Sequence, residues 1–592
     1  MRKIKYCDLD DQKNTGYKTN ETLITKQRES RIYWYYHFYE DGKEKEKYVP
    51  TIFVPELYQE IEDRRKDEKE WMCVEESTSF GYDDDAHHAG IITGIPALKL
   101  YASDVKDLRR RYCYEKLKDF LHAPPDEKVF VLYGLRRTGK SALMRQAILD
   151  LTDDELEKTA VVRIRRNDNM GLIIRIMKEL HDAGIQYVFI DEITLIEDFE
   201  DGSESLTDHF AAVFGMKIVL SGTDSLGFAF ADSQPLYKRN IPCHTTFIPY
   251  REFEYLTGIT GIDEYIRYGG TLSLGGVNYN DASTFASPYS TTAYVDSAIA
   301  KNIQNSLSFY QYGNHFRSLR DLYDANELTS AINRVIEDMN HQFTIEVLER
   351  DWKSNDFGIS AGNLRRDSVN GSDILDRIDR KAFTDRLRDM LEIKNCSERK
   401  VRITEFHTIE IKEYLEVLEL IREVTVIHLT NMAAEKRTLI TQPGLRYSQV
   451  KSLLRSLMQD WKFSSLTKEE RDNVYLRILN EVKGRMMEDI VLLETMIAKP
   501  SRKVYVVRFK AGEFDMLVHD PKENICTIYE IKHSTKTVNR QIMNLVNEEN
   551  LRMRECVFGT ITGRYVIYRG ESCVYNSIQY LNVEEYLRGL HL

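Results

Sequence analysis

A glycine-rich segment that ends in Lys-Ser, GLRRTGKS at residues 134–141, has the residue types needed to bind phosphate. It follows the apolar run 129–133 and precedes residues 142–149, which have the composition of a helix. A strand, a G-x-x-x-x-G-K-S loop and a helix are typical of a P-loop, whose backbone amides hold phosphate groups. Lys140 can reach the terminal phosphates and Ser141 can ligate Mg2+. The alternative is a chance glycine-rich turn, but spacing, strand and helix all favour a site for ATP.

A second chemical signal is the pair Asp191-Glu192, which ends the apolar run 187–190. In a parallel sheet these carboxylates lie at the carboxyl edge, beside the P-loop. Asp191 can hold Mg2+, and Glu192 can orient and deprotonate the attacking water. Acids that end strands also serve as helix caps, which is the alternative here.

Polar residues follow the next apolar run as well. Ser221 or Thr223 can hydrogen-bond the γ-phosphate or the water, or either can simply belong to a turn. Arg239 can act as an arginine finger across a subunit boundary, or form a surface ion pair. The predicted nucleotide-binding residues are Gly134, Arg137, Thr138, Gly139, Lys140, Ser141, Ala142, Ser221 and Thr223.

A separate group of charged residues lies near the C-terminus. Glu530 and Lys532 are two apart on a predicted strand, so they point the same way, and Asp515 starts the neighbouring strand of the same hairpin. Two carboxylates and a lysine can bind Mg2+ and activate water for phosphodiester cleavage, and Glu488 on the preceding helix can add a third carboxylate. The pattern resembles the D…E-x-K core of the PD-(D/E)xK, restriction-endonuclease-like superfamily. The alternatives are a plain hairpin with a charged face, and a nuclease fold kept for binding.

The elements that must position these residues alternate between strand and helix, which predicts a parallel sheet. We expect strands at 129–133, 160–164, 186–190 and 217–221, and helices at 140–151, 170–183 and 204–214. The predicted fold class is multidomain α/β: a P-loop NTPase parallel sheet with a helical lid, a winged helix and a restriction-endonuclease-like α/β domain. The predicted domains are an accessory N-terminal module with a β-hairpin (1–100), the P-loop ATPase core (101–258), a helical lid or linker (259–400), a winged-helix-like domain (401–472) and a nuclease-like domain (473–592).

Together, the motifs resemble one prokaryotic group, the archaeal-type AAA+/STAND-like ATPases fused to a winged helix and a C-terminal PD-(D/E)xK domain. The P-loop is close to the group's usual one. The other matching segments are YIRYGG at 265–270, EIKEYLEVL at 410–418, TLITQPGLR at 438–446 with Gln442 where an acid is usual, EFD at 513–515 and EIK at 530–532. Residues 1–100 and about 300–400 are not covered, and KLYASD at 99–104 stands where a G-R-E-type lead-in is usual. The resemblance implies a role in defence or mobile elements.

Composition limits the remaining possibilities. The 592 residues correspond to roughly four domains, and a net charge of -12 means that any nucleic-acid binding must use local basic patches. The eight cysteines form no C-x-x-C pair, so neither a zinc module nor a disulfide framework is indicated. No signal peptide and no apolar run of about 20 residues is present, so we expect a cytoplasmic protein without a membrane partner.

Near the N-terminus, residues 31–39 predict a strand and Asp41-Gly42 a turn, followed by a charged helix from Pro55 to about Trp71. The run DDDAHH at 83–88 can bind a metal, but a solvated linker fits it better because no partner ligands are near.

The functional expectation is an ATP-hydrolysing, DNA-directed enzyme in which nucleotide state controls Mg2+-dependent DNA cleavage. Self-assembly through the ATPase domain is a further expectation. One alternative is a nucleotide-controlled signalling or assembly switch whose nuclease fold is inactive, and another is a transcriptional regulator that uses the winged helix. Seven basic residues are expected to give the winged-helix region a phosphate-binding surface, or else an ordinary solvated face: Arg402, Lys412, Lys436, Arg437, Arg446, Lys451 and Arg455.

Overall fold

The computed structural model divides the chain into two compact units. The first comprises Met1–His87 and Ile92–Asp104, and the second comprises His88–Ile91 and Val105–Leu592. The structure describes residues 22–28, 31–40, 43–49, 90–165, 168–196, 199, 204–223, 239–272, 284–285, 287–300, 302–304, 307, 316–353, 403–459, 467–509 and 512–590. The predicted charged helix after Pro55, the run 83–88 and Arg402 lie outside the described residues.

Three antiparallel strands make up the sheet of the first unit, in the order β1-β2-β3. Glu40 of β2 pairs with Lys43 of β3, and the turn predicted at Asp41-Gly42 lies outside the described residues. The bounds are β1 (Thr22–Arg28), β2 (Arg31–Glu40), β3 (Lys43–Val49), α2 (Ile95–Tyr101) and η3 (Ser103–Val105).

A six-stranded sheet with the order β4-β6-β7-β8-β5-β9 carries the predicted P-loop. The pairs β6–β7, β7–β8, β8–β5 and β5–β9 are parallel, as the strand–helix alternation predicts. The strands are β4 (Gly90–Thr93), β5 (Val129–Tyr133), β6 (Thr159–Arg163), β7 (Tyr187–Asp191), β8 (Lys217–Gly222) and β9 (Asn240–His244). The four predicted strands therefore lie within one residue of β5, β6, β7 and β8.

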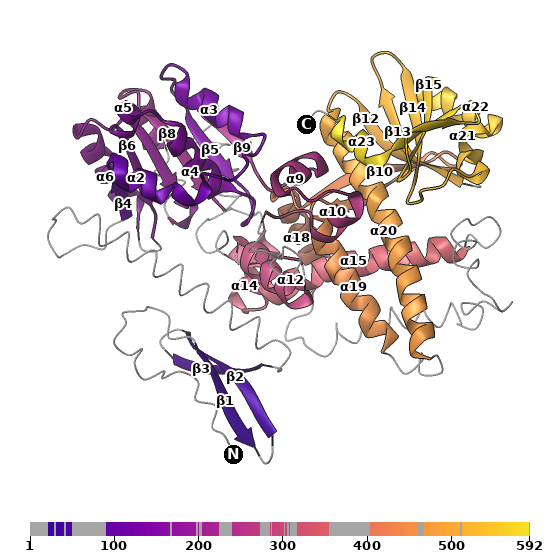
Figure 1. Cartoon of the computed structure of the whole chain (residues 1–592), viewed down its shortest axis with the longest axis horizontal. Helices are drawn as coiled ribbons and strands as arrows, with labels where there is room; N and C mark the ends of the chain where they lie inside the picture. The colour runs from indigo at the N-terminus through magenta and orange to yellow at the C-terminus, as the bar shows by residue number, and fades with distance from the viewer. Residues whose placement is uncertain are drawn as a thin grey trace. The chain divides into compact units, whose positions relative to one another are not determined.

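Helices cover both faces of this sheet (Figure 1, indigo and purple). Val129 and Val131 of β5 belong to a core cluster with α6 and η5, while Phe130 points to the other face and packs 5.5 Å from Phe120 of α3. The helices are α3 (Tyr114–His122), α4 (Lys140–Asp150), α5 (Asp153–Leu156), α6 (Met170–Asp182), η4 (Ile193–Leu195) and η5 (Leu206–Ala211). The third predicted helix, 204–214, is helical at 204–211, with η5 as its last six residues, and ends three residues earlier than expected.

The region after the sheet is helical where the structure describes it. Its core cluster includes Leu135 of the P-loop, Tyr294, Ile332, Tyr414 and Leu445, so the loop packs directly on these helices. The elements are α9 (Tyr250–Thr257), α10 (Ile262–Tyr268), α12 (Pro288–Tyr294), η6 (Val295–Ala300), α14 (Arg317–Asp324), α15 (Leu328–Lys353), α18 (Glu405–Val417) and α19 (Pro443–Met458).

The third sheet has eight strands in the order β11-β10-β12-β13-β14-β15-β17-β16. Strands β12, β13 and β14 are antiparallel neighbours, and β15 joins β14 in parallel after the helices α21 and α22. The strands are β10 (Ile421–His428), β11 (Ala433–Ile440), β12 (Lys503–Phe509), β13 (Gly512–Asp520), β14 (Ile525–Lys532), β15 (Thr560–Tyr568), β16 (Cys573–Tyr575) and β17 (Ile578–Asn582). The remaining helices are α20 (Lys468–Ala498), η10 (Asn539–Ile542), α21 (Met543–Val546), α22 (Glu548–Phe558) and α23 (Val583–Arg588).

The predicted boundary between residues 472 and 473 does not separate two sheets. The hairpin β10–β11 precedes it, yet Thr425–His428 of β10 pairs in parallel with Tyr505–Arg508 of β12. The hairpin β10–β11 thus pairs with the edge of the C-terminal sheet at β12. This pairing satisfies the backbone hydrogen-bonding groups of β10 and β12.

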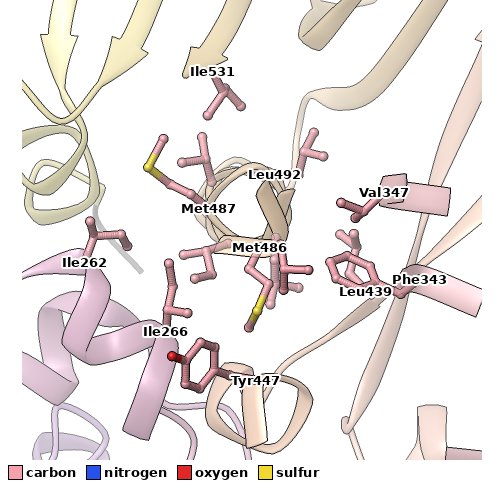
Figure 2. Close-up of a cluster of buried hydrophobic side chains, with 14 of the residues drawn as sticks. Ile262, Ile266, Phe343, Val347, Leu439, Tyr447, Met486, Met487, Leu492 and Ile531 are labelled. Carbon is pink, nitrogen blue, oxygen red and sulfur yellow. The ribbon is translucent and has the colours of Figure 1, made fainter. Parts of the chain in front are cut away.

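The 31-residue helix α20 lies at the centre of the largest hydrophobic cluster. Figure 2 shows Met486, Met487 and Leu492 of this helix surrounded by side chains from other elements. Those neighbours are Ile262 and Ile266 of α10, Phe343 and Val347 of α15, Leu439 of β11, Tyr447 of α19 and Ile531 of β14. The helix therefore joins the helical region to the C-terminal sheet. None of the helices in the described parts of the chain has the length and hydropathy to cross a membrane.

Candidate functional site

The P-loop connects β5 to α4 and takes a backbone conformation that its glycines allow. Gly134 and Gly139 have φ of 139° and 93°, in the region that favours glycine. A Cβ on Gly134 would lie 2.7 Å from Oγ1 of Thr245, so only glycine permits this close approach. Ser141 and Ala142 lie in the first turn of α4, whose N-terminal amides follow the loop and have the polarity that binds anions.

Lys140 is buried at the first position of α4. Its Nζ donates to the carbonyl oxygens of Gly134 (2.9 Å) and Leu135 (3.0 Å). Burial lowers the pKa of Lys140 to about 8, although the charges of Glu192 and Asp191 act in the opposite direction. Within the described part of the chain, the printed hydrogen bonds of this ammonium go to carbonyl oxygens, and Asp191 and Glu192 act on it through their charges.

The acidic pair lies at the carboxyl edge of β7, as the sequence predicts. Ser221 at the end of β8 donates a hydrogen bond to Oδ1 of Asp191, and Thr223 donates to Oε2 of Glu192 at 3.4 Å. Burial raises the pKa of Glu192, and the charge of Lys140 opposes this rise. The structure therefore brings Lys140, Asp191, Glu192, Ser221 and Thr223 into one site.

Thr138 and Arg137 hold the loop to other segments. Thr138 Oγ1 donates to the carbonyl oxygen of Leu135 within the loop at 2.7 Å and lies 2.8 Å from Oγ1 of Thr245, just after β9. Arg137 is exposed, has φ of 64°, and donates to Oγ1 of Thr284 at 3.2 Å. Arg137 thus reaches the helical region after the sheet.

Arg239 forms a surface ion pair with Asp208. Its side chain is 46% exposed, and within this chain it approaches no residue of the nucleotide site that the structure describes by a hydrogen bond or ion pair. This contact agrees with the surface alternative in a single copy, and a role across a subunit boundary stays a prediction.

A buried arginine, Arg111, supports the P-loop and was not predicted. It donates to the carbonyl oxygens of Thr138 (2.8 Å) and Thr245 (2.6 Å) and binds Glu252 of α9 through two nitrogens, at 3.1 and 2.7 Å. It lies 27 residues before Thr138, in a segment without a motif, so no local pattern in the sequence identifies it.

At the C-terminal sheet, Asp515, Glu530 and Lys532 meet where β13 begins and β14 ends. Lys532 Nζ lies 2.6 Å from Oδ2 of Asp515 and 2.7 Å from Oε2 of Glu530. The same Oδ2 accepts the backbone N–H of Ile531 at 2.7 Å. Both carboxylates are buried, each residue being only 2% exposed, whereas Lys532 is partly exposed.

The electrostatics of this group favour a proton on Glu530. Burial raises the pKa of Glu530, and the neighbouring charge of Asp515 adds to the rise, against the opposing charge of Lys532. Asn544 of α21 donates to Oε1 of Glu530 and to the carbonyl oxygen of Glu513, both at 3.1 Å. Asn544 lies 14 residues after Glu530 on another element, and the sequence offers no spacing rule to find it.

Glu488 does not join this group. It is buried on α20 and binds Nη1 of Arg485 at 2.5 Å. Ile531 packs on α20, so Glu530 and Lys532, which alternate with it along β14, face the opposite side of the sheet. Among the described residues, no three His, Cys, Asp or Glu side chains gather closely enough to hold a metal ion. A metal at this site would have two carboxylate ligands from the chain, Asp515 and Glu530.

The prediction of an exposed phosphate-binding surface is wrong for two of its seven basic residues. Arg446 is buried and the side chain of Arg437 is only 9% exposed, and both bind Asp489 of α20, Arg446 at 2.5 Å. Their guanidinium groups are used inside the fold because a buried carboxylate must be paired. Lys436 is exposed and binds Glu423 at 2.5 Å, and Lys412 is half-buried. Lys451 and Arg455 lie together on α19 and are considered below.

A family match agrees with the fold of the first site. Residues 126–254 match the family described as "AAA domain". A search of the curated proteins found no match. Among solved structures, this chain is 11% identical to Aeropyrum pernix ORC1 in complex with DNA, over 61% of this chain and 96% of that one, with a TM-score of 0.21.

Two further structures are similar at the same level. Pyrobaculum aerophilum CDC6P is 12% identical, over 62% of this chain and 100% of that one, with a TM-score of 0.22. The S. cerevisiae Hsp104–ADP complex is 12% identical, over 69% of this chain and 61% of that one, with a TM-score of 0.25. The family match and the P-loop on a parallel sheet together identify residues 126–254 as a P-loop AAA domain, in a mixed α/β chain that carries a second sheet domain.

Proposed function

We propose that the AAA domain binds and hydrolyses ATP with Mg2+. The P-loop amides and Lys140 would hold the phosphates, and Ser141 and Asp191 would hold the metal, directly or through water. The residues fit these groups: the buried ammonium of Lys140 donates to two carbonyl oxygens, and a hydroxyl and a carboxylate supply the oxygen ligands that Mg2+ prefers. Bound Mg2+ supplies charge neutralisation at the phosphates.

In this mechanism Glu192 acts on the attacking water. Its raised pKa makes it a better proton acceptor than an exposed glutamate, and Thr223 fixes one of its oxygens. Ser221 keeps Asp191 oriented through its hydrogen bond. Arg239 is a candidate for charge stabilisation in a neighbouring copy, which requires self-assembly through the ATPase domain.

We further propose that the C-terminal sheet domain cuts DNA, with Asp515 and Glu530 as the Mg2+ ligands. The observation that carries this proposal is that carboxylate oxygens of Asp515 and Glu530 both lie within 2.7 Å of the Lys532 ammonium. The order of the elements supports it, because α20, three antiparallel strands, α22 and a parallel strand follow the arrangement expected of the PD-(D/E)xK fold. Bound Mg2+ would supply a water nucleophile and neutralise charge at the scissile phosphate. Lys532 can orient that water by hydrogen bonding.

Nucleotide state would control this cleavage through contacts between α9, α10 and the C-terminal sheet domain. Glu252 of α9 holds Arg111, which holds the P-loop, and the amide of Tyr250 at the start of α9 donates to Oε1 of Glu494 on α20 at 2.7 Å. A shift of the P-loop on nucleotide binding can therefore move α20 through α9.

A nuclease assay with Mg2+ on single- and double-stranded DNA tests both activities. We expect wild type to cut DNA and Asp515→Ala to lose cleavage while its ATP hydrolysis persists. Lys140→Ala should lose ATP hydrolysis and any ATP dependence of cleavage. Glu523→Ala removes an exposed carboxylate from the turn of the same hairpin and should behave as wild type. Cleavage that survives Asp515→Ala would refute the assigned metal ligands.

The second candidate is a nucleotide-controlled assembly switch with an inactive nuclease fold. Lys532 favours it, because its ammonium already binds both carboxylates that a metal would need. Tightly held ADP in the purified protein, slow hydrolysis and a nucleotide-dependent change of molar mass in light scattering would support the switch. DNA-stimulated ATP turnover would support the enzyme. Sequence-specific DNA binding without cleavage would instead indicate a transcriptional regulator.

A further inference from the structure

A cavity of about 260 Å3 lies between α10 and α19, and the described residues that line it include neither a P-loop residue nor a member of the Asp515 group. Its polar and aromatic lining is rich in cations, with Arg267 on α10 and Lys451 and Arg455 one turn apart on α19. Tyr268, Tyr447 and Ser448 complete the part of the lining that matters here. No carboxylate is among the residues that line the cavity in the described parts of the chain.

The positive charge of this cavity is poorly balanced. Burial lowers the pKa of Lys451, and the charges of Arg455, Arg267 and Lys483 lower it further. Arg267 has one acidic partner, Glu264, at 2.9 Å. Among the described residues, the three cations around this concave space have one carboxylate partner, Glu264, and this excess of positive charge favours the binding of an anion.

We propose that this cavity is a binding site for a phosphate group. Two arginines and a lysine are the side chains that recognise phosphate by charge and paired N–H donors. The volume is just below the roughly 300–1,000 Å3 of pockets for small molecules, so it suits one or two phosphate groups rather than a whole nucleoside triphosphate. The phosphate can come from a nucleic-acid backbone or from a free phosphate ligand.

The position of the cavity gives its ligand a route to the C-terminal sheet domain. Lys483 Nζ lies 6.0 Å from the ring centre of Tyr447 and 3.6 Å from Oδ1 of Asp263. Asp263 in turn binds His533, the residue after Lys532. An anion bound between Lys451 and Arg267 would change the electrostatic field at Lys483, and hence the contact of Lys483 with Asp263. The site does not depend on the proposed nuclease activity, because its residues belong to neither catalytic group.

Binding is measured on the full chain with Lys140→Ala, so that the P-loop does not contribute, in EDTA at low salt. The probes are inorganic pyrophosphate by calorimetry and a fluorescein-labelled oligothymidylate by anisotropy. The pocket variant is Lys451→Ala/Arg455→Ala. The control, Lys468→Ala/Lys522→Ala, removes the same charge from exposed positions. Since Arg455 is exposed, Arg455→Ala alone provides a variant whose folding is not at risk.

We expect the pocket variant to bind the oligonucleotide about tenfold or more weakly than the control does. The slope of log affinity against log salt should fall by about 1.4, because two contacts to a single strand at about 0.7 each are lost, and Arg455→Ala should give half that change. Loss of pyrophosphate binding alone would support the site and identify its ligand as free phosphate. Equal binding by the pocket and control variants for both probes would overturn the proposal.

Discussion

Oδ1 of Asp263 lies 3.0 Å from Nε2 of His533, and this contact joins α10, just after the AAA domain, to the end of the strand that carries Glu530 and Lys532. Arg569 Nη2 lies 2.8 Å from the other oxygen of Asp263, and Lys483 lies 3.6 Å from Oδ1. Burial works against ionisation of Asp263, but the hydrogen bond with His533 and the charges around the carboxylate, among them Lys483 and Arg569, outweigh it and hold its pKa well below the ordinary value. One carboxylate thus links α10, α20 and two strands.

Replacing this carboxylate should lower stability in a pH-dependent manner. A depressed folded-state pKa stabilises the protein above the unfolded-state value, about 3.9, and this contribution is lost as the pH falls towards the folded-state pKa. We therefore expect Asp263→Asn to cost about 1–3 kcal/mol of unfolding free energy at pH 7. Urea unfolding from pH 7 to pH 3 should show the difference from wild type shrinking with acidification.

The control for this prediction is Asp472→Asn, which alters an exposed carboxylate on α20. It should change the unfolding free energy by less than about 0.5 kcal/mol. A loss in Asp263→Asn that is the same at pH 7 and pH 3 would contradict the assignment of the stabilisation to the ionised carboxylate.

Arg111 should be essential for the P-loop and for stability. Arg111→Ala leaves Glu252 as a buried unpaired carboxylate and frees the carbonyl of Thr138, so we expect a loss of about 3–5 kcal/mol together with weaker ATP binding. The neighbouring Arg110→Ala breaks the partly exposed pair with Asp150 and a cation–π contact with Tyr114, and it should cost about 1 kcal/mol or less. Thermal unfolding with and without ATP measures both effects. Similar melting temperatures for the two variants would show that the buried pair does not hold the loop.

The contrast between Lys140 and Arg111 shows what the sequence can predict. Lys140 could be predicted because its role depends on a strand, a glycine-rich loop and a helix that follow one another along the chain, so that neighbouring residues form a recognisable motif. Arg111 meets Thr138, Thr245 and Glu252 only after the chain has folded, and no spacing encodes that meeting.

The same distinction applies at the second site. The alternation of Glu530 and Lys532 and the hairpin with Asp515 are local, and the structure brings these three side chains together as predicted. Glu488 was predicted to join this group only because it lies on the preceding helix. Ile531 packs on α20, so α20 with Glu488 lies on one side of β14, and Glu530 and Lys532 face the other side. Which face of a strand meets a helix depends on the whole core, as does the pairing of β10 with β12.

Nucleotide binding should be accompanied by proton uptake at Lys140. Its folded-state pKa of about 8 leaves the amine mostly neutral at pH 8.5, and the phosphates of ATP would restore the ammonium. We expect an uptake of more than half a proton near pH 8.5 that fades towards pH 7, where Lys140 is already charged. Calorimetry in two buffers of different ionisation enthalpy measures the uptake.

Lys128→Ala is the matched control, because Lys128 is an exposed lysine that precedes β5 and binds Asp126 at 3.1 Å. It should leave the proton uptake as in wild type. Heats of ATP binding that are independent of the buffer at pH 8.5 would mean that Lys140 is already charged in the free loop.

Metal binding at the C-terminal group should tighten as the pH rises, because Glu530 must lose a proton to act as a ligand. Burial raises its pKa, so the affinity for Mn2+ as a spectroscopic probe should increase between about pH 6.5 and pH 8.5. Asn544→Ala removes the hydrogen bond that favours the carboxylate form, so we expect the midpoint of this pH profile to move upward and the Mn2+ affinity at pH 7 to fall about tenfold. Asn539→Ala, which loses only an exposed contact with Asn576, should leave the profile unchanged. Electron paramagnetic resonance of free Mn2+ gives the affinity without any need for DNA cleavage, and an affinity that does not vary with pH would show that Glu530 is not a ligand.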